Sequence, residues 1–288
     1  MGKIFNLFFL ILLFLSINTG CQSAGFDGQS ALNYIETQIA IGPRIPGTEY
    51  SQDFQKILSS ELSALGWIVE KQDFSFGGKS LANMIAKNSD RPPTIILGTH
   101  YDTRALSDQD PIEAFRTTPV PGANDGASGT AVLLELARHL SAYPESLWLV
   151  FFDAEDQGHI DNWEWSVGAQ FFADQLTTIP DEVIIIDMIG DSDLNIYLEK
   201  NSSPEISDKI WSVARELGFD DHFIFEYKNA IIDDHLPFIN KGISAVLIID
   251  LDYAFWHTTQ DDLEHVSADS LEIVGNVILE YLARRPAN

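Results

Sequence analysis

The chain has 288 residues, of which 45% are hydrophobic and 21% are charged. This composition is typical of a folded globular protein, and the length allows one large domain or two small ones. The 17 basic and 43 acidic residues give a net charge of −26, which would repel the backbone of a nucleic acid and excludes nucleic acids as partners. The single cysteine, Cys21, excludes an internal disulfide and a metal site with several thiolates, so His, Asp and Glu remain as candidate metal ligands.

The first 21 residues are typical of an export signal. Lys3 provides a positive charge, an apolar run covers 4–17, and a patch of small residues precedes Cys21. The run is too short to span a bilayer comfortably. The position of Cys21 is similar to the lipidation site of bacterial lipoproteins, so we predict an exported protein of the cell envelope with a lipid anchor on Cys21. An ordinary secreted protein is the alternative.

The elements predicted from about residue 33 onward alternate between helices and strands. A helical pattern covers 53–65, and a half-buried strand pattern follows over 67–74. Continuous apolar runs, typical of strands covered on both faces, occupy 94–99, 147–152, 183–186 and 245–249. Further helical patterns occupy 126–140, 204–217 and 268–282, the last with Ser267 as its N-cap. We therefore expect a single α/β domain whose mixed, mostly parallel central sheet is flanked by helices.

Histidines and acids follow the four apolar runs. In chain order these residues are His100, then Asp153, Glu155 and Asp156, then Asp187, and then Asp250, Asp252 and His257. Asp125 lies in a glycine-rich loop, 121–126, that opens the next helix. Ligands in open α/β sheets bind beyond the carboxyl ends of the strands, so these side chains are expected at one rim. Each alone could be a helix cap or an ordinary loop residue. Together they predict a zinc site with His and carboxylate ligands.

Six segments resemble motifs of the zinc aminopeptidases with co-catalytic metal sites. They are HYDT (100–103), PGANDGASG (121–129), FFDAEDQG (151–158), IIDMIGD (185–191), DDHLPFINKG (233–242) and FWHTTQDD (255–262). Within that family the chain is most similar to the animal-type glutaminyl cyclases. The resemblance implies a three-layer zinc-exopeptidase fold, with residues 22–288 as one catalytic domain that acts on peptide or protein N-termini.

The resemblance also implies a set of metal ligands. Asp125, Asp156 and His257 would hold the zinc that the cyclases use. The aminopeptidases of the family bind a second zinc, which His100 and Asp187 would hold here, with Asp125 between the two metals. We therefore expect one zinc ion for a cyclase and two for an aminopeptidase.

Catalytic and substrate-binding roles follow from the same resemblance. Glu155 would be the general acid/base, and in cyclases Asp187 belongs to a hydrogen-bonded network with Asp233. The cyclases have an aromatic substrate wall, which here would be formed by Trp163, Trp165 and Trp256. The chain departs from most of the family by having Asp156 where a second glutamate is usual.

The motifs leave the activity open between two reactions. We predict a zinc-dependent glutaminyl-peptide cyclotransferase, which converts an N-terminal glutamine to pyroglutamate and releases ammonia. A zinc aminopeptidase that removes N-terminal residues is the main alternative, and a catalytically silent binding protein is a third. We expect a monomer that contacts the membrane only through its lipid anchor.

Overall fold

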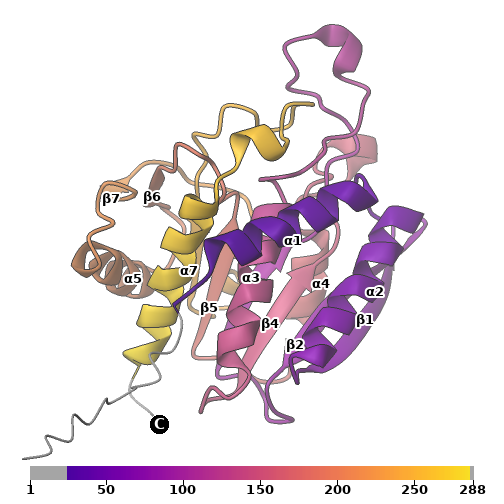
Figure 1. Cartoon of the computed structure of the whole chain (residues 1–288). Coiled ribbons are helices and arrows are strands. Elements are labelled where there is room, and N and C mark those ends of the chain that lie inside the picture. Colours follow the sequence, from indigo (N-terminus) through magenta and orange to yellow (C-terminus); the bar gives the residue numbers. More distant parts are fainter. Residues whose placement is uncertain (1–24, 286–288) are drawn as a thin grey trace, which may run out of the picture.

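A six-stranded sheet runs through the centre of the computed structural model, which describes residues 25–285 (Figure 1). Its strands are β1 (Ile68–Phe76), β2 (Lys79–Lys87), β3 (Ile95–His100), β4 (Leu147–Phe152), β5 (Glu182–Asp187) and β8 (Ala245–Ile249). Their spatial order is β1-β2-β4-β3-β5-β8. β3 pairs in parallel with β4 and β5, and β5 does so with β8, whereas β2 is antiparallel to β1 and β4. The predicted mixed, mostly parallel sheet is confirmed.

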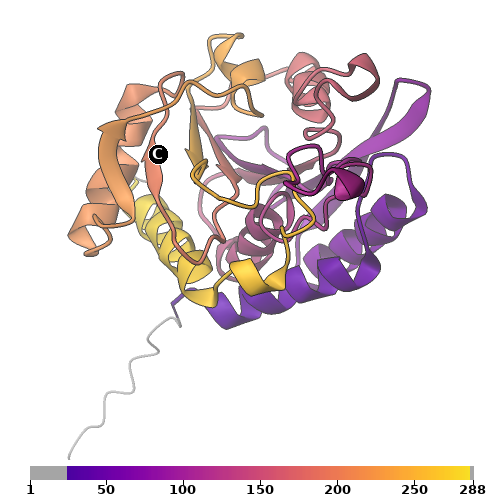
Figure 2. The ribbon, with the colours of Figure 1, turned by 90° about the horizontal axis from the view of Figure 1, so that it is seen from above.

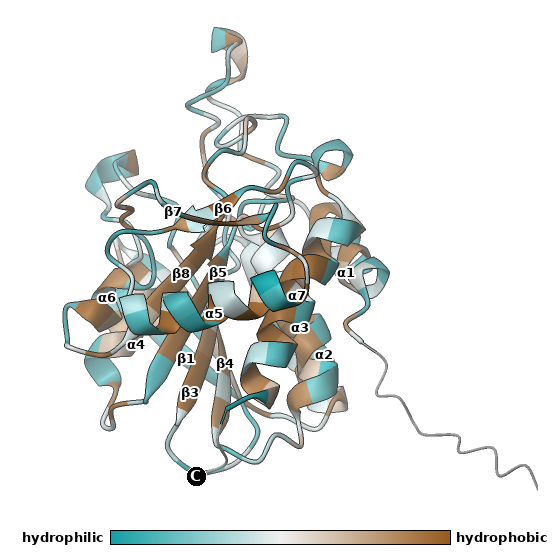
Figure 3. Ribbon diagram, turned by 90° about the vertical axis from the view of Figure 1, so that its left-hand side faces the viewer, coloured by the Kyte–Doolittle hydropathy of each residue, from teal (hydrophilic) through white to brown (hydrophobic). Residues whose placement is uncertain are grey.

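The burial of each strand follows from its place in the sheet. Every residue of β3, β5 and β8 is buried, which is why these strands are continuous apolar runs. β1 is an edge strand, and most of its side chains are exposed or half-buried. In Figure 3 the central strands are brown and the outward faces of the helices are largely teal.

Helices cover both faces of the sheet, so the domain has three layers. The larger core contains residues of α1 (Gly28–Ile41), α2 (Glu49–Ala64), α3 (Ala127–Leu140), α5 (Pro204–Glu216) and α7 (Ala268–Ala283). A smaller core contains residues of α4 (Val167–Gln175) and α6 (Leu236–Ile239). Figure 1 shows α1, α3 and α7 in front of the sheet. Ser267 caps α7 as predicted, because its hydroxyl accepts a hydrogen bond from the N–H of Ser270 at 3.1 Å.

Two segments lie outside these layers. β6 (Ile196–Leu198) and β7 (Phe223–Tyr227) form a separate two-stranded parallel sheet. Residues 105–119, which we call the arm, leave the body after β3 and carry a short 3₁₀ helix, Glu113–Phe115, at the top of Figure 1. Among residues 25–285 no helix combines the length and the apolar character needed to cross a membrane. The predicted export signal, 1–21, and its Cys21 lie outside the described residues.

Candidate metal centre and active site

The candidate site lies at the edge of the sheet where four parallel strands end. His100 and Asp187 are the last residues of β3 and β5. Glu155 and Asp156 lie in the loop after β4, and His257 lies in the loop after β8. Figure 2 looks down on the loops at this edge. The strand order therefore brings together side chains that are up to 157 positions apart in sequence, as expected for an open α/β sheet.

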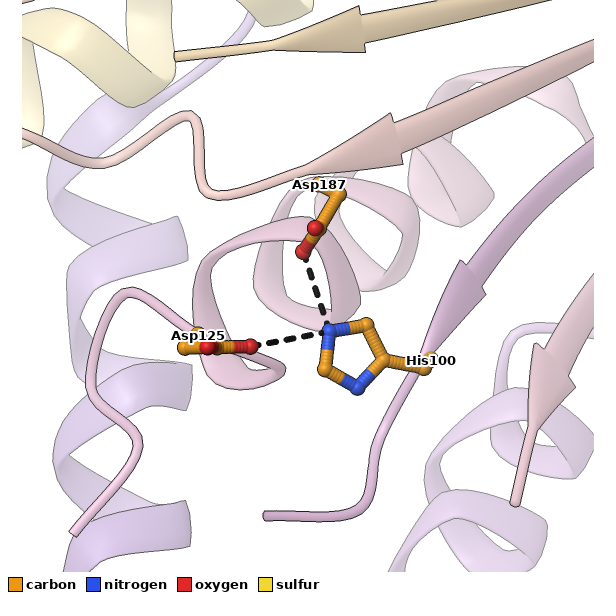
Figure 4. Close-up of side chains that lie close together, drawn as sticks. All are labelled: His100, Asp125 and Asp187. Carbon is orange, nitrogen blue, oxygen red and sulfur yellow. Dashed lines mark hydrogen bonds and ion pairs between the residues drawn. The ribbon is translucent and has the colours of Figure 1, made fainter. Parts of the chain in front are cut away.

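One buried group consists of His100, Asp125 and Asp187 (Figure 4). The His100 Nε2 atom lies 3.0 Å from Oδ1 of Asp187 and 3.2 Å from Oδ1 of Asp125. One ligand atom from each residue can be chosen so that all three lie within 4.8 Å of one another. These are the residues expected to hold a second metal.

A second buried group consists of Asp125, Asp156 and His257. The His257 Nε2 atom lies 2.9 Å from Oδ1 of Asp156 and 3.6 Å from Oδ2 of Asp125. Asp125 thus belongs to both groups, with one carboxylate oxygen toward each histidine. This arrangement is what a carboxylate shared between two metal ions requires.

The donors of the second group fit a zinc ion. Imidazole nitrogens and carboxylate oxygens are common zinc ligands. Oδ1 of Asp156 faces the cationic or ionisable groups of His257, at 2.9 Å, and Arg104, at 3.6 Å, while its Oδ2 is buried without a hydrogen-bond partner among the described residues. Buried polar atoms are nearly always satisfied in folded proteins, so the unpartnered Oδ2 indicates that this carboxylate has room for a cation.

Two buried aspartates hold the loops that carry these ligands. Asp102 accepts hydrogen bonds from the backbone N–H groups of Glu155, at 2.9 Å, and Asp156, at 3.2 Å. Asp261 does the same for Asn124, at 2.7 Å, and Asp125, at 3.1 Å. Each aspartate thereby satisfies a loop backbone that forms no regular secondary structure.

Backbone strain is concentrated beside the site. Ala154 has φ 60°, Met188 has φ 44° and His257 has φ 56°, and none of these is a glycine. Each is a candidate ligand or immediately precedes or follows a candidate site residue. Such conformations cost about 1–3 kcal/mol each and are typical of functional sites, where the surrounding structure enforces them.

Burial and charge shift the pKa values of the second group. Burial raises the pKa of Asp156 to about 6. Burial would lower the pKa of His257, but the negative charge of Asp156 and the hydrogen bonds to Asp108 and Asp156 together outweigh it and raise that pKa to about 9. The metal-free protein therefore holds a proton on His257 at neutral pH, paired with the carboxylates that would otherwise share a cation.

Glu155 lies among further buried acids. Burial raises its pKa well above the ordinary range, and Ser166 Oγ lies 3.4 Å from its Oε1. Burial also raises the pKa of Asp233 well above its usual value, and that of Asp234 to about 8, with Asp187 contributing to both. The structure thus places Asp233 in the electrostatic neighbourhood of Asp187 and Glu155.

The three candidate tryptophans occupy different places. The Trp256 ring stacks on His257 with centroids 3.7 Å apart, and Trp165 stacks on it at 5.9 Å. Trp163 is instead buried beneath the turn between β1 and β2, 5.0 Å from the Phe76 ring. A Cβ atom on Gly77 would lie 2.5 Å from the Trp163 ring, so only glycine fits there. The structure therefore brings Trp165 and Trp256 to the candidate metal site but not Trp163.

Arg104 and Asp108 are at the site although the sequence patterns did not indicate them. Arg104 pairs with both carboxylate oxygens of Asp108, at 2.8 and 2.9 Å, and donates to the backbone oxygen of Asp156 at 3.1 Å. Asp108 lies in the arm, with Oδ1 3.5 Å from Nδ1 of His257. The one available signal was that Arg104 follows the HYDT motif directly.

The sequence patterns also did not indicate the structural role of His235. It is fully buried, and its Nε2 lies 3.2 Å from the Glu199 carboxylate. Glu199 also accepts hydrogen bonds from the backbone N–H groups of Ile231, at 2.9 Å, and Ser202, at 2.7 Å. These contacts fix the segment that carries Asp233.

A cavity of about 450 Å³ adjoins the site, and we call it the side cavity. Trp165, Ser166 and Asp233 line it, so it begins at the candidate active-site residues. A larger hollow of about 570 Å³ lies between α2 and the β1–β2 strands, and none of the candidate site residues lines it.

Comparisons with known proteins point to one family with two activities. The model described as Peptidase family M28 matches residues 81–282. Aminopeptidase YwaD of Bacillus subtilis is 28% identical over 283 residues, which are 89% of this chain and 56% of that protein. The glutaminyl-peptide cyclotransferase of Bos taurus is 25% identical over 292 residues, covering 83% of this chain and 78% of that protein. This chain therefore spans little more than half the length of the aminopeptidase.

A solved structure is similar over nearly the whole chain. The glutaminyl cyclase of Tannerella forsythia matches with a TM-score of 0.85 and 32% identity, covering 91% of this chain and 100% of that one. Its identity exceeds that of the bovine protein, so the similarity to the animal-type enzymes is the more distant one.

Proposed function

The chain belongs to peptidase family M28, and on that premise we propose that it is a zinc-dependent glutaminyl-peptide cyclotransferase that acts on peptide or protein N-termini. The observation that carries the proposal is a further buried carboxyl group, that of Asp233, which lines the side cavity beside Trp165 and Ser166 and lies in the electrostatic neighbourhood of Asp187 and Glu155. A glutamine side chain ends in an amide with two N–H donors, and closely placed carboxyl groups can accept both. The similarity to the Tannerella forsythia cyclase supports the same choice.

The reaction joins the α-nitrogen of an N-terminal glutamine to its own side-chain carbonyl carbon and breaks the bond to the amide nitrogen. Glu155 would take the proton from the attacking amine and return it to the departing ammonia. Asp187 and Asp233 would accept hydrogen bonds from the amide nitrogen and hold the carbonyl carbon near the amine. Because both reacting groups belong to one residue, orientation supplies much of the rate.

Asp125, Asp156 and His257 would hold the catalytic zinc ion. Bound there, the metal would supply Lewis-acid polarisation of the side-chain carbonyl. Trp165 and Trp256 both stack against the His257 ring and would exclude water from the reacting groups, which strengthens the electrostatic interactions among them.

The test is to mix the zinc-loaded protein with one peptide that begins with glutamine and one that begins with leucine, and to follow both by mass spectrometry. Loss of ammonia from the glutamine peptide, with the leucine peptide unchanged, is the expected result. Release of the first residue from either peptide would overturn the cyclase proposal.

Glu155→Gln is the matching variant, and we expect it to slow cyclisation about 10²–10⁴-fold while zinc binding persists. Asp161→Asn is its control. Asp161 is an exposed acid of the same loop with φ 51°, a conformation that asparagine tolerates. Full activity of Glu155→Gln would remove Glu155 from the mechanism.

Aminopeptidase activity is the second candidate, and the shared carboxylate of Asp125 favours it. A second metal at His100 and Asp187 would complete a two-metal site. The number of zinc ions bound per chain, measured by elemental analysis, separates the two: two ions together with residue release support the peptidase.

We also propose that the protein works outside the cytoplasm, held at the cell envelope by a lipid on Cys21. The apolar segment at 4–17, followed by the short patch 18–20 and then by this cysteine, supports the proposal. Mass spectrometry of the mature N-terminus tests it, and a chain that still begins at Met1 would contradict it.

A further inference from the structure

The side cavity has the size and lining of a ligand site. Its volume of about 450 Å³ falls within the range of about 300–1,000 Å³ that is usual for small-ligand pockets. Its walls come from three elements, with Phe76 on β1, Phe171 on α4 and Leu236 on α6. Besides the candidate active-site residue Asp233, the acidic residues of the lining are Glu164 and Asp174.

The cavity is continuous with the proposed catalytic residues. Ser166 lines it, and the hydroxyl of that residue lies 3.4 Å from the Glu155 carboxylate. Trp165 lines it too, and its ring also stacks on His257. A peptide whose first residue lies beside Glu155 can therefore extend its next residues into the cavity.

The apolar walls are fixed in place but partly open to water. The rings of Phe74 and Phe171 stack with centroids 4.8 Å apart. Phe76 is 37% exposed and rests edge-on against the buried Trp163. Ile232, across the cavity, is 65% exposed. An occupant that covers these two side chains gains the free energy of burying apolar surface.

We propose that the side cavity is a specificity subsite for a large apolar side chain that follows the N-terminal residue of the peptide substrate. This inference rests on the proposed function, because it assumes that the substrate is a peptide N-terminus. Phe76 and Ile232 would determine the preference, and Trp163 would act one step away by supporting Phe76. The acidic residues of the lining would tolerate a basic residue further along the peptide but disfavour an acidic one.

The experiment compares two peptides, Gln-Phe-Ala and Gln-Gly-Ala, on the zinc-loaded protein and on Phe76→Ser and Ile232→Ser. We expect the native protein to favour the phenylalanine peptide in kcat/KM, and each variant to reduce that preference roughly tenfold. Turnover of the glycine peptide should stay unchanged. Ile179→Ser is the matched control, because Ile179 is 75% exposed and does not line the side cavity.

Equal kcat/KM for the two peptides in the native protein, or an unchanged preference in both variants, would overturn the subsite. The failure of the proposed function has a different signature, which is that neither glutamine peptide is cyclised. In that case the turnover of Leu-Phe-Ala is compared with that of Leu-Gly-Ala. The binding of all four peptides to Glu155→Gln is also measured by calorimetry. The subsite then stands only if the phenylalanine peptides bind more tightly and Ile232→Ser removes the difference.

Discussion

Asp108 illustrates how a residue that no motif includes can control a metal ligand. The carboxylate of Asp108 lies 3.5 Å from Nδ1 of His257, whereas the candidate metal position is at the Nε2 side of the ring. Arg104 donates hydrogen bonds to both oxygens of this carboxylate and so fixes its position. Carboxylates in this position fix the tautomer and orientation of ligating histidines. Arg104 also lies over the Trp165 ring, at 5.1 Å, so one guanidinium supports both the ligand and the aromatic wall.

We therefore expect Asp108→Asn to weaken zinc binding by about 10–100-fold. Competition against a chelator of known affinity measures this directly and does not depend on activity. Glu113→Gln is the control, because Glu113 is an exposed acid of the same arm. Equal zinc affinity in the two variants would mean that Asp108 does not orient His257.

The raised pKa of His257 predicts that zinc binding depends on pH. Below about pH 9 the metal-free protein holds a proton on His257, and zinc must displace that proton because only the neutral ring binds metal. The apparent affinity should then rise about tenfold per pH unit between pH 7 and 9 and level off above. Chelator competition across this range, with the chelator's own titration subtracted, checks the slope. A flat profile would mean that the His257 ring is already neutral.

At the scale of the elements, the loop before α3 depends on one glycine. Gly126 has φ 91°, and a Cβ atom there would lie 2.4 Å from the backbone oxygen of Asp102, which holds the Glu155 loop. Gly126→Ala should therefore lower the free energy of unfolding by the strain of the positive φ and by an additional 1–3 kcal/mol, roughly, for the clash.

A denaturation experiment on Gly78→Ala separates the strain of the positive φ from the clash. Gly78 has φ 77°, but its added Cβ would meet nothing within 4 Å. Gly126→Ala should be less stable than Gly78→Ala by the clash alone. If both variants lose the same stability, the close approach of Gly126 to Asp102 is not costly.

The elements also differ in how well the sequence predicts them. β4 and β8 match their predicted ranges, because strands that are covered on both faces leave an unmistakable apolar run. β2 was missed because it is an antiparallel strand whose middle is buried on both faces, so its polar and apolar residues do not alternate. α1 was also missed, since only four of its residues are buried.

The sequence predicts those site residues that lie at the ends of strands. It does not predict those whose position depends on packing between distant segments. His100, Asp187 and the residues after β4 could be placed from the strand-end rule alone. Asp261 could not, because its role depends on a hydrogen bond to Asn124, 137 positions earlier. The position of Trp163 could not be predicted either, because nothing in the pattern indicates that Gly77 provides a space for its ring.

At the scale of the whole molecule, the net charge of −26 should affect the rate at which the protein binds charged peptides. A strongly acidic protein attracts cationic peptides over a distance set by the Debye length, about 30 Å at 0.01 M salt and about 3 Å at 1 M. We expect kcat/KM for a peptide with two lysines to fall on the order of tenfold between these salt concentrations.

An otherwise identical peptide with two glutamates is the comparison for this effect. Its kcat/KM should rise with salt, because screening removes a repulsion. Parallel responses of the two peptides would show that salt acts on the enzyme itself rather than on the encounter.

The arm offers a place where the chain can be lengthened without altering the chemistry. Its root is fixed, because Gln109 donates to the backbone oxygen of His257 at 3.1 Å and Ser107 donates to that of Thr118 at 2.7 Å. Residues 111–118 are all exposed. Exposed loop tips tolerate insertions. A binding peptide or a fluorophore grafted between Ile112 and Phe115 would therefore project from the edge that carries the active site, as a handle for capturing substrates or for reporting their arrival, while the ligands beneath keep their geometry.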